Sequence, residues 1–371
     1  MIEERKRILK MVEEGKLTVD EALTLLEGLE QANNEKEQKH QEIITELSTE
    51  VKFKQAGKED PYSYNQESVK TKFIHFVDNT LKKIRDLDLD FNFGHAVEVR
   101  HIFQHSDVLI NQIDLDVANG SVNIKPWDTN DVRIECDAKV YKVETQENAR
   151  QAFLQDVLFS IEGGKLWFAV QKKQMKVNAV LYVPEADYDR IKVRMFNGPI
   201  SGERLKVKDF KAKTANGVIS CNQMTTDAVE LETANGHIKM LESQSQNCEI
   251  ETINGTIHVT GVYEKVDFQS FNGNIICSFQ NNACHTAFIK TTTGNIDLYV
   301  PKDSSIDGEF KSNLGGFTCE LPGMDVVEDK NEVVQKSLRF KVNKQADRPM
   351  RIIADTKTGS VLIKQIGGKS L

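Results

Sequence analysis

The chain has no long hydrophobic run. No stretch of about 18 consecutive apolar residues occurs in its 371 residues, so we expect no helix that crosses a bilayer. The first residues, MIEERKRILK, carry charges where a secretory signal peptide needs an apolar segment. We therefore expect a cytoplasmic protein, which could also attach peripherally to the membrane. A cell-surface location reached by a non-classical route is the alternative.

Clustered positive charge and paired cysteines are also missing. The formal net charge is −8, and phosphate binding needs clustered positive charge, so we expect no nucleic-acid partner. None of the six cysteines forms a CxxC pair, which argues against a zinc or redox site. We expect reduced thiols that are mostly buried as small hydrophobic side chains, in a reducing compartment. They are Cys136, Cys221, Cys248, Cys277, Cys284 and Cys319.

Catalytic signatures are absent as well. The sequence contains no GxSxG, Walker loop, Rossmann glycine pattern or HExxH. It has only two tryptophans, Trp127 and Trp167, so an aromatic platform for sugars is not evident. Among the eight histidines, His237 and His258 lie on neighbouring repeats but two places out of register. We therefore expect no catalytic residues, no cofactor and no metal site.

What the sequence does contain is a repeat. The dipeptide Asn-Gly recurs in steps of 19, 19, 19 and 18 residues, and Thr293-Gly294 follows 21 residues later as a degenerate copy. An isoleucine stands three residues after each Asn. A fixed period of this length indicates a repeat architecture. The Asn-Gly pairs are Asn197-Gly198, Asn216-Gly217, Asn235-Gly236, Asn254-Gly255 and Asn272-Gly273, and the isoleucines are Ile200, Ile219, Ile238, Ile257, Ile275 and Ile296.

Apolar and polar residues alternate before each Asn. The apolar residues stand six and four places before it, and mainly charged ones stand five and three places before it, which is typical of a strand with one buried face. Asn-Gly then supplies residues that tolerate positive φ at a corner. The first apolar set is Ile191, Phe210, Val229, Cys248 and Val266, and the second is Val193, Ala212, Leu231, Ile250 and Phe268.

Two mainly β folds fit this pattern. One is a single-stranded β-solenoid of parallel stacked coils, each of about 19 residues, in which the Asn side chains form a hydrogen-bonded ladder. The other is an antiparallel β-sandwich of Asn-Gly hairpins with type I′ turns. Stacking explains why equivalent positions carry similar side chains in every copy. We therefore predict that residues 95–371 form the solenoid. An early coil surrounds Asn119-Gly120, residues 145–158 suggest a short helix, and residues 160–167 suggest a hairpin. We expect the last coil to close the stack near Ile363.

Helices are expected before the repeats. Residues 1–30 read as a helical hairpin, with a capping box at Thr18 and Glu21 and a second helix that stops near Gly28. Residues 31–65 are polar and read as a linker that is mobile or loosely helical. The hairpin is too small to fold alone without help, so its apolar side needs a partner surface.

These residues carry a resemblance to a known family. The segment RILKMVEEGKLTVDEALTLLEGL resembles the SHOCT-like helical module that opens YvlB-like and LiaX-like proteins of Gram-positive bacteria. The Asn-Gly-x-Ile coils from Asn119 onward are similar to the β-solenoid family labelled putative adhesins, which forms the C-terminal part of those proteins. The resemblance implies a role in sensing or regulating cell-envelope stress. It also implies a protein partner, such as a membrane protein related to the phage-shock system.

Residues 66–94 predict an amphipathic helix followed by a first strand. Apolar residues recur on one helical face, with basic residues on the others. Such a helix can cover one open end of a solenoid, which we favour, or lie in the headgroup layer of an anionic membrane. The residues proposed for this role are Phe73, Phe76, Val77, Leu81, Lys82, Lys83, Ile84 and Arg85.

Stacking would also align the charged residues of successive coils. Lysine and arginine columns at one end would then continue as carboxylates, which form a candidate binding surface. Like charges about 4.8 Å apart repel, so this column could hold a cation or dock a basic partner, or its side chains could simply be solvated. The five residues are Glu230, Glu232, Glu249, Glu251 and Asp267.

Three functions compete on this evidence. The first is a non-enzymatic regulatory or scaffold protein of the envelope-stress response, which binds a membrane-associated partner or the membrane surface. The second is an adhesin-like surface module that binds glycan or protein. The third is a carbohydrate-active β-helix enzyme, which would use paired carboxylates of the candidate binding surface. The first is our prediction, and the oligomeric state stays open.

Overall fold

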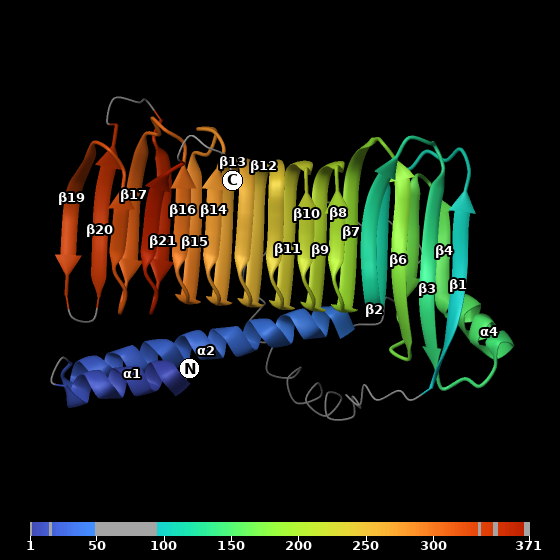
Figure 1. Cartoon of the computed structure of the whole chain (residues 1–371), viewed down its shortest axis with the longest axis horizontal. Helices are drawn as coiled ribbons and strands as arrows, with labels where there is room; N and C mark the ends of the chain where they lie inside the picture. The colour runs from blue at the N-terminus through green and yellow to red at the C-terminus, as the bar shows by residue number, and fades with distance from the viewer. Residues whose placement is uncertain (1, 15–16, 49–94, 333–334, 344–347, 367–371) are drawn as a thin grey trace, which may run out of the picture.

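The computed structural model describes residues 2–14, 17–48, 95–332, 335–343 and 348–366 (Figure 1). The predicted amphipathic helix and strand of residues 66–94 lie outside this range, and so does the second part of the predicted linker, from residue 49 to residue 65. Within the described residues, no helix has the length and apolar character needed to cross a membrane.

Parallel coils form the centre of the molecule, as the repeat predicts. Leu231 lies beside Ala212 on one side and Ile250 on the other, in parallel register. The strands that flank Asn235 do not fold back on each other, so the antiparallel sandwich is wrong for these coils. The stack contains β7 (Asp187–Asn197), β8 (Ile200–Glu203), β9 (Lys206–Asn216), β10 (Ile219–Asn222), β11 (Thr225–Asn235), β12 (Ile238–Asn254), β13 (Ile257–Asn272), β14 (Ile275–Phe279), β15 (Thr286–Thr293) and β16 (Ile296–Val300).

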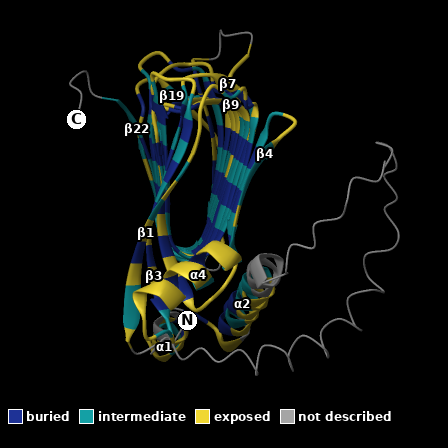
Figure 2. Cartoon of the chain, turned by 90° about the vertical axis from the view of Figure 1, so that its right-hand side faces the viewer, coloured by how far each residue is buried: buried dark blue, intermediate teal, exposed yellow. Residues whose placement is uncertain are grey.

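Each coil contributes to two facing sheets (Figure 2). The apolar residues six and four places before each Asn point between the sheets and are at most 3% exposed, and the repeated isoleucines are fully buried. The longer strands β12 and β13 turn from one sheet into the other, with a register shift after Met240. This continuous core follows directly from the period-two alternation, because only one side of each strand is apolar.

Asparagine side chains form the predicted ladder along one corner of the stack. The amide of Asn235 donates to Asn216 at 2.9 Å and accepts from Asn254 at 2.7 Å. The ladder extends at one end to Asn119 and at the other to Thr293, whose hydroxyl donates to Asn272 at 2.6 Å. Each side-chain amide forms hydrogen bonds with the equivalent residues of the neighbouring coils, so the ladder fixes the register of successive coils.

The glycine after each Asn has a different role from the predicted one. Gly217, Gly236, Gly255 and Gly273 do not have positive φ values, and neither does any Asn of the ladder. A Cβ atom at Gly236 would lie 1.9 Å from the carbonyl oxygen of Gly217 in the coil below. Close approach of backbones, rather than a left-handed turn, therefore requires glycine in the middle of the stack. Only Gly120, Gly198 and Gly294 of the described column also have positive φ.

The described cysteines behave as predicted. All six are free thiols, and only Cys319 is more than slightly exposed. Burial raises the pKa of Cys136 and Cys221 to about 12. These thiols stay protonated at neutral pH and pack as small hydrophobic groups.

Sequence-distant strands complete the stack at the N-terminal end. β2 (Gln112–Trp127) pairs in parallel with β7 and β8, which places Asn119 directly beside Asn197. Beyond β2 lie β5 (Lys165–Val170) and β6 (Met175–Pro184), again in parallel. β4 (Val157–Glu162) forms the predicted hairpin with β5, and β3 (Val132–Tyr141) and β1 (Ala96–His105) add antiparallel strands.

The C-terminal end corrects one prediction. The coil formed by β21 (Met350–Thr356) and β22 (Val361–Gln365) does not close the stack near Ile363. It lies between the coil of β15 and β16 and that of β17 (Ile306–Ser312) and β18 (Phe317–Glu320). The antiparallel strands β20 (Lys336–Val342) and β19 (Met324–Asn331) follow at the outer end. β17 pairs with β21 on one side and with β20 on the other, so the last coil of the chain lies inside the stack.

A short helix covers the N-terminal end between the sheets (Figure 2). α4 (Gln146–Asp156) begins at Thr145, whose side chain caps the helix by accepting from the backbone N–H of Asn148. Phe153 is fully buried and lies among the aromatic rings of Phe103 and His101. The predicted segment at 145–158 therefore supplies a cap for this end.

The two N-terminal helices form a hairpin that continues farther than predicted. α1 (Ile2–Glu13) packs against α2 (Val19–Ser48) around Ile8, Leu25 and Leu29, and Leu314 of the solenoid adjoins this cluster. The predicted capping box is present, because Thr18 and Glu21 exchange hydrogen bonds. α2 does not stop near Gly28 but continues to Ser48, so the first part of the predicted linker is helical. This longer helix contacts β7, β9, β11 and β12 of the solenoid.

Candidate functional site

The candidate binding surface lies on the outer face of the sheet that contains β7, β9, β11 and β12. Three outward columns run along this face, named by their distance before each Asn of the ladder. The minus-five column is Asp114, Lys192, Lys211, Glu230, Glu249 and Asp267. The minus-three column is Asp116, Arg194, Lys213, Glu232, Glu251 and Gln269. The minus-one column is Ala118, Phe196, Ala215, Ala234, Ile253 and Phe271.

The predicted alignment of the five carboxylates is present. Glu230 lies beside Glu249, and Glu249 beside Asp267. Glu232 lies beside Glu251 in the next column. The structure therefore brings all five residues to one face, although it divides them into a column that faces solvent and one that is largely covered.

The minus-five column faces solvent. Lys211 donates to Glu230 at 2.6 Å, and Gln269 donates to Asp267 at 3.0 Å. Glu249 is exposed beside a shallow groove of about 190 Å³. The Lys211 contact offsets part of the repulsion along the column, as expected for a solvated charged surface. Glu230, Glu249 and Asp267 are thus the accessible part of the candidate binding surface.

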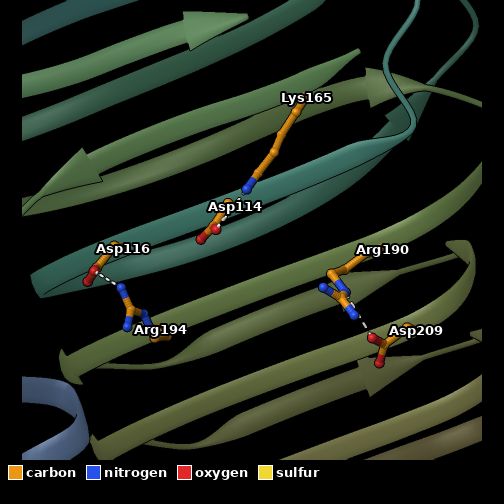
Figure 3. A network of polar contacts seen from close by, with 6 residues as sticks. All are labelled: Asp114, Asp116, Lys165, Arg190, Arg194 and Asp209. Atoms are coloured by element: carbon orange, nitrogen blue, oxygen red, sulfur yellow. Dashed lines mark hydrogen bonds and ion pairs between the residues drawn. The ribbon is translucent and has the colours of Figure 1, made fainter. Parts of the chain in front are cut away.

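The minus-three column consists of successive ion pairs. Arg194 pairs with Asp116, which belongs to the coil joined from β2 (Figure 3). In the next rungs Lys213 contacts Glu232 at 2.7 Å. Glu251 has no cation opposite it on the sheet, because its parallel neighbours are Glu232 and Gln269. Its cation comes from another part of the chain.

That cation is Lys39 of α2. Its Nζ atom lies 3.0 Å from an oxygen of Glu251 and 4.0 Å from Oε1 of Glu232. The side chains of Glu251 and Glu232 are 19% and 8% exposed, so both contacts are largely shielded from water. Burial raises the pKa of Glu251, while Lys39 acts in the opposite direction. The lysine therefore stabilises a carboxylate that would otherwise be costly to bury.

The minus-one column forms an apolar floor next to these ion pairs. Strand alternation points its side chains outward, yet Ala234 and Ile253 are fully buried and Ala215 is 1% exposed. Ala234, Ile253 and Phe271 form a small cluster of their own, separate from the core between the sheets. α2 contacts β7, β9, β11 and β12 and runs across the ends of these strands (Figure 1). It therefore covers the floor.

Sequence analysis missed this covered face. The available signal was an apolar residue immediately before each Asn, on the polar side of an otherwise alternating strand. The spacing of Asn33, Lys36, Lys39 and His40 places them on one side of a helix, and the structure shows this side half-buried. Neither signal identifies its partner, because the helix and the strands are about 200 residues apart in the chain.

Cation binding finds no further support in the described residues. They contain no group of three or more histidine, cysteine, aspartate or glutamate side chains arranged to hold a metal ion. Of the predicted column, Glu230, Glu232 and Glu251 already contact lysines. Docking of a basic partner and a simply solvated surface both stay predictions, and Lys39 of α2 already contacts part of this surface.

Comparison with known proteins agrees with this architecture. The family model described as Toastrack DUF4097 matches residues 110–362. The chain belongs to the Toastrack family. A SHOCT-like domain model also matches residues 3–34, which include all of α1 except Ile2 and the first part of α2. The Toastrack chain is 49% identical to YvlB of Bacillus subtilis (strain 168) over 369 residues, covering 98% of this chain and 99% of YvlB.

Solved structures give weaker similarity. A crystal structure titled "putative adhesin" from Bacteroides fragilis has 14% identity and a TM-score of 0.37, covering 72% of this chain and 97% of that one. A "putative lipid binding protein" from Parabacteroides distasonis has 13% identity and a TM-score of 0.35, with the same coverage. These scores are too low to support an inference about the Toastrack chain.

Proposed function

We propose that this Toastrack protein is a non-enzymatic regulatory scaffold of the cell-envelope stress response. It acts by holding a membrane-associated protein partner on the outer face of the β7–β12 sheet. The observation that carries the proposal is the seating of Lys39 against Glu251 and Glu232. A face whose carboxylates hold a lysine of one helix has the charge to hold a basic residue of another helix.

The stack suits a scaffold because its register is fixed. The asparagine ladder and the buried isoleucines tie the successive coils from Asn119 to Thr293 to one another, so the three outward columns keep constant spacing. A surface held in this way loses little conformational entropy when a partner binds. The solvent-facing carboxylates Glu230, Glu249 and Asp267, of which Glu249 is exposed, would then attract a basic partner and help to orient it.

The envelope-stress part of the proposal is supported by resemblance. The chain combines a SHOCT-like hairpin with a Toastrack stack, and in this combination it resembles YvlB-like and LiaX-like proteins. A cytoplasmic protein at the membrane surface would be positioned to meet a phage-shock-type membrane protein. The alternative contact is the anionic surface of the membrane itself, and the test below distinguishes it from a protein partner.

In-cell photo-crosslinking tests the proposal. A photoreactive amino acid replaces Glu249 in the full chain, and cells are irradiated before and after treatment with an antibiotic that damages the envelope. We expect a cross-linked membrane protein, more abundant after treatment. The matched control carries the same amino acid at Lys341, an exposed residue of β20 at the far end of the stack, and should give no such product.

Two other results would change the conclusion. A chain that stays in the soluble fraction without cross-links, before and after treatment, would contradict the proposal. Co-sedimentation of the purified chain with anionic vesicles, without protein cross-links in cells, would assign the contact to lipid instead.

A further inference from the structure

The fit between α2 and the solenoid is incomplete. Among the described side chains of residues 33–40 of α2, the half-buried ones are Asn33, Lys36, Lys39 and His40, whereas the apolar floor of the sheet includes Ala234, Ile253 and Phe271. Polar side chains of this kind gain little from burial against an apolar floor. A groove of about 200 Å³ also remains between α2 and the sheet, lined by residues that include Gln38, Glu251, Phe271 and Lys290.

One buried oxygen in this interface lacks a hydrogen bond. Glu232 is 8% exposed at its side chain, and its Oε2 atom contacts Lys213 at 2.7 Å. Its Oε1 atom is buried without a hydrogen-bond donor, because Lys39 lies 4.0 Å away and forms its closer contact with Glu251. Leaving a buried carboxylate oxygen unpaired is costly. The guanidinium of arginine carries five N–H donors and can reach two acceptors at once, so arginine suits this position better than lysine does.

We propose that the face beneath α2 is a helix-binding groove, and that an amphipathic helix of the partner protein, with an arginine at the place of Lys39, displaces α2 from it. α2 is then an internal competitor that keeps Glu232, Glu251 and the apolar floor covered until the partner arrives. This proposal rests on the proposed function in taking the occupant to be a protein. It adds that the partner binds through an amphipathic helix, and that displacement of α2 exposes the site.

A labelled peptide of residues 19–48 serves as the probe. It is mixed with the full-length chain, either unchanged or carrying Lys39→Glu, which places a carboxylate opposite Glu251 and weakens the resident helix. We expect the Lys39→Glu chain to bind the peptide at least about tenfold more tightly, measured by fluorescence anisotropy. A peptide carrying Lys39→Arg should bind this chain more tightly than the unchanged peptide does.

Three controls isolate the groove. Lys10→Glu makes the same charge change in an exposed pair with Glu14 of the same helical module, and should leave peptide binding at the level of the unchanged chain. A peptide carrying Lys39→Glu should not bind the Lys39→Glu chain. The double variant Lys39→Glu with Glu251→Lys restores the ion pair, and should again exclude the unchanged peptide.

Hydrogen exchange provides a readout that does not depend on the peptide. Backbone amides of residues 30–40 should exchange at least about tenfold faster in the Lys39→Glu chain, and the double variant should restore their protection. Equal exchange and equal peptide binding in the unchanged and Lys39→Glu chains would overturn the proposal. Dimers formed by the Lys39→Glu chain through its own helix would also overturn it, by assigning the groove to a second copy. Either result leaves the photo-crosslinking at Glu249 independent, so the two proposals can fail separately.

Discussion

At the scale of single residues, stacking changes what each side chain is required for. Gly236 is needed because the carbonyl oxygen of Gly217 occupies the space where a Cβ atom would lie. Thr252, two residues before its Asn, is fully buried and donates its hydroxyl to the carbonyl oxygen of Gly236 at 3.0 Å. The same contact recurs at Thr233 and Gly217. A single coil would require neither the glycine nor the threonine, because each of these contacts joins two neighbouring coils.

Replacing Gly236 by alanine should therefore be severe. The added methyl group must displace backbone in the coil below, and we expect a loss of about 3 kcal/mol or more in the free energy of unfolding. Urea unfolding followed by circular dichroism measures it. Gly28→Ala is the matched control, because nothing lies within 4 Å of the new Cβ and the site is inside α2. It should be neutral or stabilise the chain by up to about 1 kcal/mol. Equal effects at both positions would contradict the close-approach argument.

At the scale of elements, ion pairs join neighbouring strands of the stack, some of which are far apart in the sequence. Arg194 and Arg190 both lie on β7, but they pair in opposite directions (Figure 3). Arg194 is 17% exposed and pairs with Asp116 of β2, whereas Arg190 is 59% exposed and pairs with Asp209 of β9. Burial raises the pKa of Asp116, and Arg194 counteracts this effect. The two ion pairs should therefore differ in strength and in their dependence on pH.

Arg194→Met should leave Asp116 as a buried carboxylate without its cation, at a cost of about 2 to 4 kcal/mol at pH 7. The pKa of Asp116 should rise further, above its value in the unfolded chain. The folded variant then takes up a proton at a higher pH than the unfolded one, so its stability deficit should shrink as the pH falls from 7 towards 5. Urea unfolding at several pH values measures this. Arg190→Met should cost less than about 1 kcal/mol at either pH. A deficit for Arg194→Met that grows as the pH falls would refute the assignment.

At the scale of the whole molecule, the chain order differs from the order of coils. β21 and β22 lie inside the stack, and β17 to β20 lie outside them. In the same way, β2 joins the repeat from a point 78 residues earlier, through Asn119 and Asn197. At each end of the stack, strands that are distant in the chain are therefore paired with one another. Such long-range pairing should make unfolding more cooperative than in a simple linear array.

Ile352 tests this arrangement. It is fully buried on β21, between Ala287 of β15 and Gly308 of β17. Ile352→Ala should cost about 2 to 5 kcal/mol, and the whole β region should unfold at the lower urea concentration in one step. Val327→Ala, at a residue of the outer strand β19 that is 57% exposed, should change stability by less than about 0.5 kcal/mol. Hydrogen exchange checks the cooperativity. Loss of protection confined to residues 350–365 would indicate that the inserted coil is independent.

The sequence by itself determined the local design of this protein. Period-two alternation, Asn-Gly and the isoleucine at plus three predict stacked coils, and the columns from Asn197 to Thr293 align as predicted. The five carboxylates of the candidate binding surface could be placed on one face for the same reason, since equivalent positions in equal repeats must fall in register. The capping box at Thr18 and the cap at Thr145 also follow from short-range patterns.

Only the tertiary structure decided what covers that face and which coil comes last. α2 crosses Glu232 and Glu251, and β21 enters between β15 and β17, through contacts between residues far apart in the chain. A repeat specifies how one coil meets the next, but it carries no information about which distant segment will occupy an outer face or an open edge. That choice depends on matching surfaces, and those surfaces exist only once the coils are stacked.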